Sequence, residues 1–306
     1  MKMYLAVAAT LFSLPVVAQS DVPMEDQSQL APSQQPAPGT DYFQPPNESD
    51  LPDNAFGELV REGRAIFVDT RKLAPEYVGN GMTCANCHLD QGRKPNSAPL
   101  WGAYPMYPAY RSKNDKVNTY VERMQGCFQF SMDGTPPPPD SHVLNALSAY
   151  SYWLSTGAPV SEVQPGRAYP EVPEPAGGYD LAKGREVYDD QCAICHGAEG
   201  QGQKSGDDFV FPPLWGKESF NWGAGMHRIN TAAAFIKESM PLGKGGSLTD
   251  EQAWNVAAYM NSHERPQDPR LVNGSVEETR KKFHANDGVN LYGVEVDGVV
   301  LGQGIN

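Results

Sequence analysis

The pentapeptide Cys84-Ala85-Asn86-Cys87-His88 has a close counterpart in Cys192-Ala193-Ile194-Cys195-His196. Both fit the pattern C-x-x-C-H, in which two thiols can bond to the vinyl groups of a haem and the next residue can ligate its iron. A zinc site or a redox dithiol would explain a single copy, although zinc normally takes four ligands from cysteine and histidine. Two copies predict two covalently bound haem c groups, with His88 and His196 as proximal ligands of the irons.

The N-terminus has the pattern of a cleaved secretory leader. Lys2 precedes an apolar run from Tyr4 to Val17, and Val16-Val17-Ala18 is a small-residue cleavage site. The apolar run is too short to span a bilayer unaided. We therefore expect residues 1–18 to be a signal peptide, the mature chain to have no membrane span, and its location to be the periplasm. A retained membrane anchor is the alternative interpretation.

Charge and cysteine content narrow the class of protein further. The 306 residues carry a formal net charge of −13, which argues against a nucleic-acid partner because such binding needs clustered cations. Four of the five cysteines belong to the two haem motifs, so Cys127 is left over and cannot form a disulfide within the chain.

Amphipathic stretches surround the first haem motif. Residues 19–50 are rich in Pro, Gln, Ser and Asp and predict a flexible linker. A helix is expected from Asp53, with its apolar side formed by Phe56, Leu59, Val60, Gly63, Ile66 and Phe67. A second helix is expected from Val117 to Phe130, and a third after Ser141 as N-cap. A haem motif after the first of three helices is typical of a class I cytochrome c domain, here residues 51–163.

The same pattern then starts again. Residues 164–178 are rich in proline and glycine and predict an interdomain linker. Asp180 can cap a helix that leads into the second haem motif, and Thr249 opens a capping box with Gln252 before the last helix of this unit. Residues 179–265 therefore predict a second cytochrome c domain.

The expected fold class is mainly α, with two tandem class I cytochrome c domains and a short C-terminal extension. The tetrapeptide Pro-Leu-Trp-Gly supports the duplication, since it occurs at residues 99–102 and again at 213–216. The extension, residues 266–306, contains a capping box at Ser275 to Glu278 and a hairpin turn at Asp297-Gly298.

Each haem iron needs a second axial ligand. In the second domain we predict Met240, which lies in a loop just before the last helix, with Met226 and His227 as competitors.

In the first domain two measures of spacing disagree. Met132 lies 44 residues after His88, as Met240 does after His196. Counted from the tryptophan of Pro-Leu-Trp-Gly, Cys127 lies 26 residues on, whereas Met240 lies 25 residues on. Spacing favours Cys127 and leaves Met132 and an open site as alternatives.

Longer segments carry a more specific likeness. Residues 81–89, 92–101, 107–114 and 122–128 closely resemble the dihaem thiosulfate dehydrogenase family, and Thr279 to Phe283 is similar but less specific. The resemblance covers most of the chain from about Gly81 onward. It implies that Cys127 is the thiolate ligand of the first iron and that this haem is the active site. It also implies oxidation of two thiosulfate ions to tetrathionate, with the reverse reduction possible in some members.

A dianionic substrate needs a cationic site. Between Leu89 and Cys127 there are six basic residues and three acidic ones, a local balance of +3. Arg123 precedes Cys127 by four residues and Ser131 follows it by four, so an α-helix would place all three on one face. We predict Arg123 and Arg111 as clamps for the sulfonate group, because guanidinium forks suit oxyanions, and Ser131 as a hydrogen-bond donor.

Electrons should leave through the second haem. A thiolate ligand favours ferric iron, whereas His and Met favour ferrous iron, so electrons would pass from the first haem to the second and on to an external acceptor such as a small cytochrome c. The main alternative is a non-catalytic dihaem electron carrier in which Met132 ligates the first iron. A dihaem peroxidase and a Sox-type sulfur-oxidising cytochrome are further alternatives.

Overall fold

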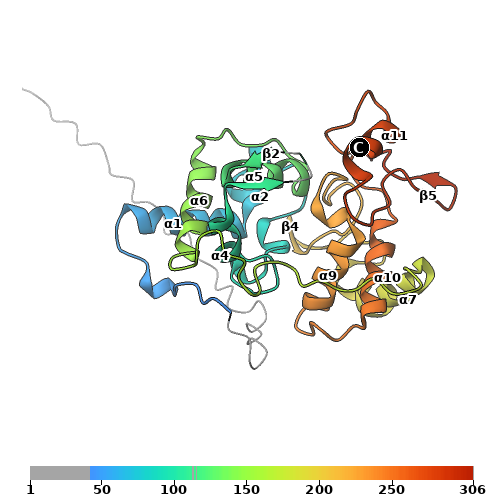
Figure 1. The fold of residues 1–306 in the computed structure, drawn as a ribbon, viewed down its shortest axis with the longest axis horizontal. Coiled ribbons are helices and arrows are strands. Elements are labelled where there is room, and N and C mark those ends of the chain that lie inside the picture. The colour runs from blue at the N-terminus through green and yellow to red at the C-terminus, as the bar shows by residue number, and fades with distance from the viewer. Residues whose placement is uncertain (1–41, 112–113, 115, 306) are drawn as a thin grey trace, which may run out of the picture. The chain divides into compact units, whose positions relative to one another are not determined.

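The computed structural model describes residues 42–111, 114 and 116–305, so the predicted signal peptide and residues 19–41 of the predicted linker lie outside the described residues. Helices dominate this part of the chain, and its strands form three antiparallel pairs (Figure 1). No helix among the described residues is long and apolar enough to cross a bilayer.

The elements around the first haem motif begin and end where local chemistry dictates. Asn54 caps the first long helix by accepting hydrogen bonds from the backbone of Phe56 and Gly57. Ser141 caps the last one, as predicted, by accepting from Leu144 N. In chain order the elements are η2 (Glu48–Asp50), α1 (Ala55–Val68), α2 (Thr70–Leu73), η3 (Pro75–Tyr77), η4 (Cys84–Asn86), α3 (Leu89–Gly92), α4 (Leu100–Ala103), η5 (Tyr104–Met106), β1 (Ala109–Arg111), β2 (Lys116–Asn118), α5 (Tyr120–Gly126), η6 (Cys127–Ser131) and α6 (His142–Leu154).

The helix expected from Val117 begins later than predicted. Lys116–Asn118 pairs with β1 as an antiparallel strand, and Val117 is 59% exposed instead of facing inward. Thr119 forms a capping box with Glu122, so α5 starts at Tyr120. The reciprocal hydrogen bonds of the capping box fix the helix start more strongly than the apolar periodicity does.

The second haem motif lies in a similar arrangement. Asp180 and Thr249 cap the first and last long helices, as predicted. The elements are α7 (Leu181–Gln191), α8 (Ala193–His196), β3 (Gln203–Ser205), β4 (Asp208–Phe211), η7 (Gly225–His227), α9 (Ile229–Ser239) and α10 (Asp250–Asn261). The C-terminal extension contains α11 (Val276–Thr279), η8 (Arg280–His284), β5 (Glu295–Val296) and β6 (Val299–Val300), and the hairpin predicted at Asp297-Gly298 joins the last two.

In each domain the first and last long helices cross at a glycine. A Cβ atom added to Gly63 of α1 would lie 2.0 Å from the carbonyl oxygen of Ala146 in α6. One added to Gly184 of α7 would lie 2.1 Å from the carbonyl oxygen of Asn255 in α10. Both distances are far below van der Waals contact, so the close packing of each helix pair depends on the missing side chain.

Two segments expected to be linkers make specific contacts. Phe43 packs on Trp101 with ring centroids 5.6 Å apart, and Arg93 Nη1 donates to Pro46 O at 2.9 Å. In the segment 164–178, Val172 is buried and its carbonyl accepts a hydrogen bond from Trp254 Nε1 at 3.1 Å. Isolated apolar residues in a polar, proline-rich stretch leave no periodic signal, which is why sequence reasoning treated them as linker.

Candidate active site

The two histidines predicted as proximal ligands are held in the same way. His88 Nδ1 donates to Ala98 O at 2.7 Å, and His196 Nδ1 donates to Pro212 O at 2.9 Å. In each domain the acceptor is the residue just before Pro-Leu-Trp-Gly. Because a carbonyl oxygen only accepts, Nδ1 carries the proton and Nε2 keeps a lone pair for a metal. Burial lowers the pKa of His88 to about 4 and lowers that of His196 as well, which favours the neutral ring that ligates iron.

The thiols of the two haem motifs lie in apolar surroundings. All five cysteines of the chain are free thiols. Burial raises the pKa of Cys84, Cys87 and Cys192 to about 12. Thr70 Oγ1 lies 3.4 Å from the sulfur of Cys84. Apolar thiol pairs followed by a neutral, oriented histidine fit the attachment and proximal ligation of haem c.

Cys127 lies beside the first haem motif. It begins the π-helix η6 directly after α5, and Met132 N donates to Cys127 O at 3.0 Å to close the wide turn. The Cys127 thiol adds to the effect of burial in raising the pKa of Cys84 and Cys87, so the three sulfurs belong to one site. Single π-turns within helices are frequent at functional sites.

Both predicted arginine clamps belong to this site. Arg123 Nη1 donates to Cys127 Sγ at 3.1 Å, and the Cys127 sulfur, followed by the hydroxyl of Tyr107, raises the pKa of Arg123. Arg111 Nη1 donates to the same Tyr107 hydroxyl at 2.9 Å. Tyr107 thus bonds to one guanidinium group and influences the pKa of the other, and both arginines are partly buried.

Ser131 is held through its backbone. Its backbone carbonyl accepts from Asn80 Nδ2 at 3.0 Å, and the same amide donates to Ser219 O at 2.9 Å. The expected alignment of Ser131 with Cys127 assumed α-helical geometry, whereas residues 127–131 form a π-helix.

Sequence reasoning missed the tyrosines of the site. Tyr169, in the segment expected to be a linker, donates from its hydroxyl to Cys87 O at 3.1 Å and packs edge-on against Phe235 of α9. Tyr120 donates to Ser151 Oγ at 2.8 Å. Burial raises the pKa of both hydroxyls, so they stay protonated at neutral pH. A lone aromatic residue in a stretch rich in proline and glycine was the only signal for Tyr169.

The structure also distinguishes between Met240 and His227 as candidate ligands of the second haem. Met240 follows α9 as its C-cap and is partly buried against the core. His227, a competitor for the iron, is fully buried with Nδ1 bonded to Ala224 O and Nε2 3.2 Å from His284 Nδ1. Both ring nitrogens of His227 are therefore engaged away from the haem motif. His227 and His284 are 0% and 1% exposed, so neither is a surface residue, although isolated histidines in a polar sequence are more often exposed.

Comparison with protein families defines the class first. Residues 76–160 match the SoxA/TsdA cytochrome c domain, and residues 180–260 match cbb3-type cytochrome c oxidase subunit III. With the helical architecture described above, these matches define a protein with two cytochrome c domains.

Individual relatives then identify the family. The chain is 74% identical over 290 residues to a thiosulfate dehydrogenase of Stutzerimonas stutzeri (95% of this chain, 94% of the relative). It is 54% identical over 261 residues to one of Thiomonas intermedia (85% of this chain, 82% of the relative). The chain therefore belongs to the thiosulfate dehydrogenase family of oxidoreductases, which confirms the assignment made from sequence segments.

A solved structure agrees with this assignment. The thiosulfate dehydrogenase TsdBA from Marichromatium purpuratum, in its as-isolated form, is similar with a TM-score of 0.82 and 49% identity. The similarity covers 86% of this chain and 58% of that chain, so this protein spans somewhat more than half the length of that relative.

Proposed function

We propose that this protein is a periplasmic dihaem cytochrome c that oxidises two thiosulfate ions to tetrathionate. A bond forms between the terminal sulfurs of the two ions and two electrons leave, with no net transfer of protons. The reverse reduction uses the same groups. The observation that carries the proposal is the Cys127 sulfur beside the first haem motif, 3.1 Å from the guanidinium of Arg123.

The residues that would hold the haem groups fall into two sets. Cys84, Cys87, Cys192 and Cys195 would form the covalent links. His88 and Cys127 would ligate the first iron, and His196 and Met240 the second. When bound, the two haem groups supply two one-electron acceptors, which together match the two electrons released. The predicted leader supports a periplasmic location.

Arg123 and Arg111 would bind the sulfonate end of thiosulfate. A guanidinium presents paired donors to oxyanion oxygens, and partial burial weakens the competition from water. The Tyr107 hydroxyl bonded to Arg111 would orient that side chain toward Arg123. A donor role for Ser131 remains a prediction, since only its backbone carbonyl has a recorded hydrogen bond, to Asn80.

Electrons would leave the first site by way of the second domain. Ser97 Oγ lies 3.1 Å from Ser239 Oγ, and Ser239 directly precedes Met240. Ser97 in turn precedes Ala98, whose carbonyl accepts from His88. Two peptide bonds and two hydrogen bonds therefore connect His88, the proposed proximal ligand of one iron, to Met240, the proposed distal ligand of the other. Tyr169, from the segment between the domains, bonds to Cys87 O of the first domain and packs on Phe235 of the second, with ring centroids 5.5 Å apart.

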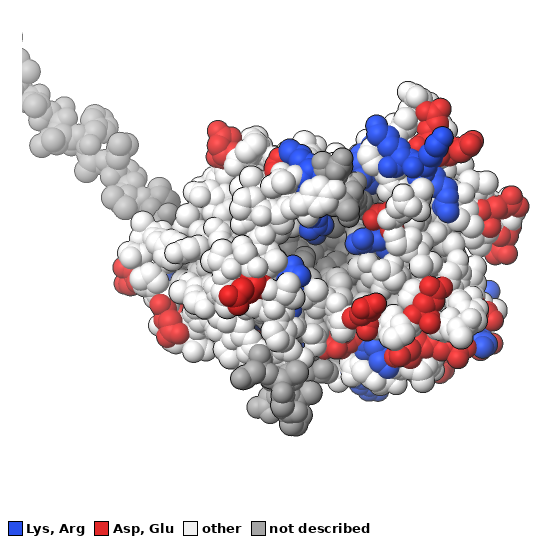
Figure 2. Space-filling model, viewed as in Figure 1, with Lys and Arg blue, Asp and Glu red and all other residues white. Residues whose placement is uncertain are grey.

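The external acceptor would be a small carrier such as a cytochrome c. Figure 2 shows lysine and arginine gathered over α11 and η8, and acidic side chains over α7 and α10 of the second domain. An acidic surface on this domain would attract a carrier with a positively charged docking face, and salt would weaken the association.

The decisive experiment mixes the anaerobic oxidised holoprotein with thiosulfate while the haem absorption bands are recorded. We expect reduction of the haem bands and release of tetrathionate. The Cys127→Gly variant should lose most of its thiosulfate turnover. It should also lose the low-spin signal of a His/thiolate-ligated haem in electron paramagnetic resonance. Met132→Leu is the matched control, because it preserves volume at the alternative sulfur ligand and should keep both properties.

The same measurements separate enzyme from carrier. If thiosulfate leaves the haem bands unchanged and the resonance signal is of the His/Met type in both domains, the protein is a non-catalytic dihaem electron carrier. Turnover in Cys127→Gly equal to that of the unmodified protein would also contradict the proposal.

A further inference from the structure

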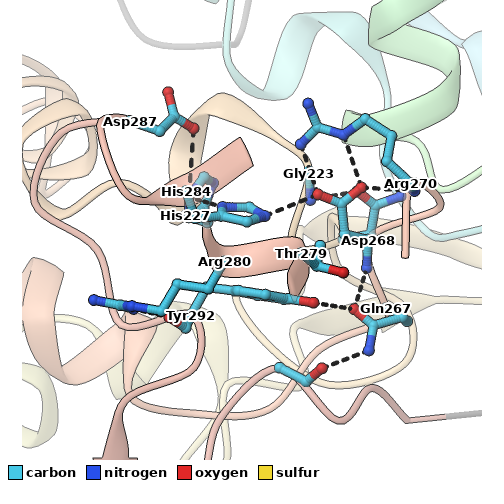
Figure 3. A network of polar contacts seen from close by, with 12 residues as sticks. Gly223, His227, Gln267, Asp268, Arg270, Thr279, Arg280, His284, Asp287 and Tyr292 are labelled. Carbon is cyan, nitrogen blue, oxygen red and sulfur yellow. Dashed lines mark hydrogen bonds and ion pairs between the residues drawn. The ribbon is translucent and has the colours of Figure 1, made fainter. Parts of the chain in front are cut away.

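A buried cluster of side chains lies between the second cytochrome domain and the C-terminal extension. It consists of His227 from η7, His284 from η8 and Asp287 just after η8, which are 0%, 1% and 8% exposed (Figure 3). One ring nitrogen of each histidine and one carboxylate oxygen all lie within 4.8 Å of one another. None of these residues has a place in the thiosulfate chemistry proposed above.

The outer hydrogen bonds of the cluster fix where its protons lie. His227 Nδ1 is 2.5 Å from Ala224 O, which can only accept, so this nitrogen is the donor. His284 Nε2 is 2.9 Å from Asp268 Oδ2. Arg270 pairs with Asp268 through Nη2 at 2.6 Å and Nε at 2.9 Å, so Asp268 is an ionised acceptor and His284 Nε2 carries a proton.

With both rings neutral, the two inner nitrogens are acceptors, and they face each other. His284 Nδ1 and His227 Nε2 are 3.2 Å apart, and Asp287 Oδ2 lies 3.7 Å from the same His227 nitrogen. Two lone pairs and a carboxylate oxygen repel one another at this range unless a positive species lies between them. Around a tetrahedral zinc ion with bonds of about 2.0–2.1 Å, ligand atoms are about 3.3 Å apart.

We propose that His227 Nε2, His284 Nδ1 and Asp287 Oδ2 bind a borderline divalent cation, with zinc as the reference ion. Two histidines and one carboxylate suit such an ion, and a water molecule would take the fourth position. The Ala224 carbonyl and the Asp268 carboxylate orient the ligating rings, as outer partners of metal-bound histidines usually do. Arg228 Nη1 lies 3.4 Å from Oδ1 of Asp287 and so neutralises the outer oxygen, leaving Oδ2 for the ion.

The burial of the site gives it a structural role. Substrate cannot reach side chains that are almost fully buried, whereas an ion there would tie η7 of the second cytochrome domain to the C-terminal extension. Because such an ion binds only the folded chain, it stabilises the protein by mass action. Its removal should therefore loosen the extension without changing the haem content.

The test measures metal content in the holoprotein, purified without a histidine tag or metal-affinity resin. Inductively coupled plasma mass spectrometry should find one zinc or similar divalent ion for every two haem irons, with iron as the internal standard. Dialysis against dipicolinate should remove this ion, lower the Tm by several degrees and speed proteolysis of residues 266–306. Re-addition of zinc should restore both properties.

Variants distinguish this site from adventitious binding. His284→Gln and the near-isosteric Asp287→Asn should lose the divalent ion while retaining both irons, and the second variant serves if the first fails to fold. His142→Gln is the matched control, since that histidine is 65% exposed and pairs with Glu62 far from the cluster, and it should retain the ion. If the purified protein contains no divalent ion and zinc does not raise its Tm, the proposal is overturned. The short distance between the two rings would then be explained by a proton that they share. Retention of the ion in both cluster variants would overturn the proposal too.

Discussion

At the scale of single residues, the proposed site of the first haem holds a positive charge against a sulfur. Arg123 and Cys127 are four residues apart at the junction of α5 and η6, and the guanidinium donates to the sulfur at 3.1 Å. A donor in this position lowers the electron density on the sulfur and so raises the reduction potential of a thiolate-ligated iron. The same side chain has further N–H groups for a sulfonate, so one residue can tune the iron and bind the substrate.

Replacing Arg123 by Gln should weaken thiosulfate binding. Loss of a hydrogen bond to a charged group costs about 1.5–3 kcal/mol, which corresponds to a fall of about 10- to 100-fold in kcat/KM, mainly through KM. Steady-state kinetics with thiosulfate measure this effect, and potentiometry should show a lower potential for the first haem. Arg185→Gln is the control, because Arg185 is exposed in the second domain and pairs only with the exposed Asp189 in the recorded contacts. An unchanged KM in Arg123→Gln would remove this residue from the substrate site.

Individual site residues were predictable only where the motif or the helical spacing carries the information. The attachment cysteines follow from the motif, and Arg123 follows from its spacing to Cys127 along an α-helix. Tyr169 could not be predicted, because it reaches Cys87 from 82 residues further along the chain. The change from α-helix to π-helix at Cys127 could not be predicted either, because it leaves no mark in apolar periodicity.

At the scale of elements, the first and last long helices of each domain pack closely together at a glycine. Gly63 in α1 and Gly184 in α7 each face a backbone carbonyl of the partner helix at a distance that excludes a side chain. The sequence pattern placed Gly63 on the inward side of its helix, which is correct. It could not show that the two glycines mark the crossing points, because a glycine on an apolar stripe is also compatible with simple close packing.

Gly184→Ala should destabilise the second domain. The added methyl group would have to push α7 away from α10, and overpacking of this kind typically costs about 1–3 kcal/mol. Denaturant unfolding followed by far-ultraviolet circular dichroism measures the loss. Gly177→Ala is the matched control, since no atom lies within 4 Å of its added Cβ and its φ is not in the left-handed region. Equal stability of the two variants would mean that the helix crossing adjusts without strain.

At the scale of the whole described chain, polar contacts join the two cytochrome domains. Asn221 Nδ2 donates to Gln129 O at 2.9 Å and to Asp133 Oδ1 at 2.8 Å, and Ser97 meets Ser239. The duplication itself was evident from the repeated haem motif and from Pro-Leu-Trp-Gly. The contacts between the domains were not evident from the sequence, because they pair single polar residues about 90 or more positions apart. Such pairs have no periodic or compositional signature.

Asp133 at this contact should make stability depend on pH. Burial raises the pKa of Asp133 above its usual range, with the hydrogen bond from Asn221 opposing that effect. A carboxyl group whose pKa is higher in the folded state favours that state only while it is protonated. Stability therefore falls as the pH rises from the pKa of the group in the unfolded state to its pKa in the folded state. Asp133→Asn should therefore raise the Tm at pH 7, and the gain should shrink toward zero near pH 3.5.

Glu122 provides a control of opposite sign. Its hydrogen bond from Lys116 lowers its pKa to about 2, so ionised Glu122 favours the folded state above the unfolded pKa, and this contribution disappears as the pH falls toward 2. Glu122→Gln should therefore lower the Tm at pH 7, where Asp133→Asn raises it, and scanning calorimetry at both pH values measures the two differences. Asp133 lies at the contact between the domains, whereas Glu122 lies within the first domain. If only Asp133→Asn raises the Tm in a pH-dependent way, the unfavourable ionisation is located at the domain contact. A lower Tm for Asp133→Asn at pH 7 would mean that the charge-assisted hydrogen bond to Asn221 outweighs the cost of burying the carboxylate.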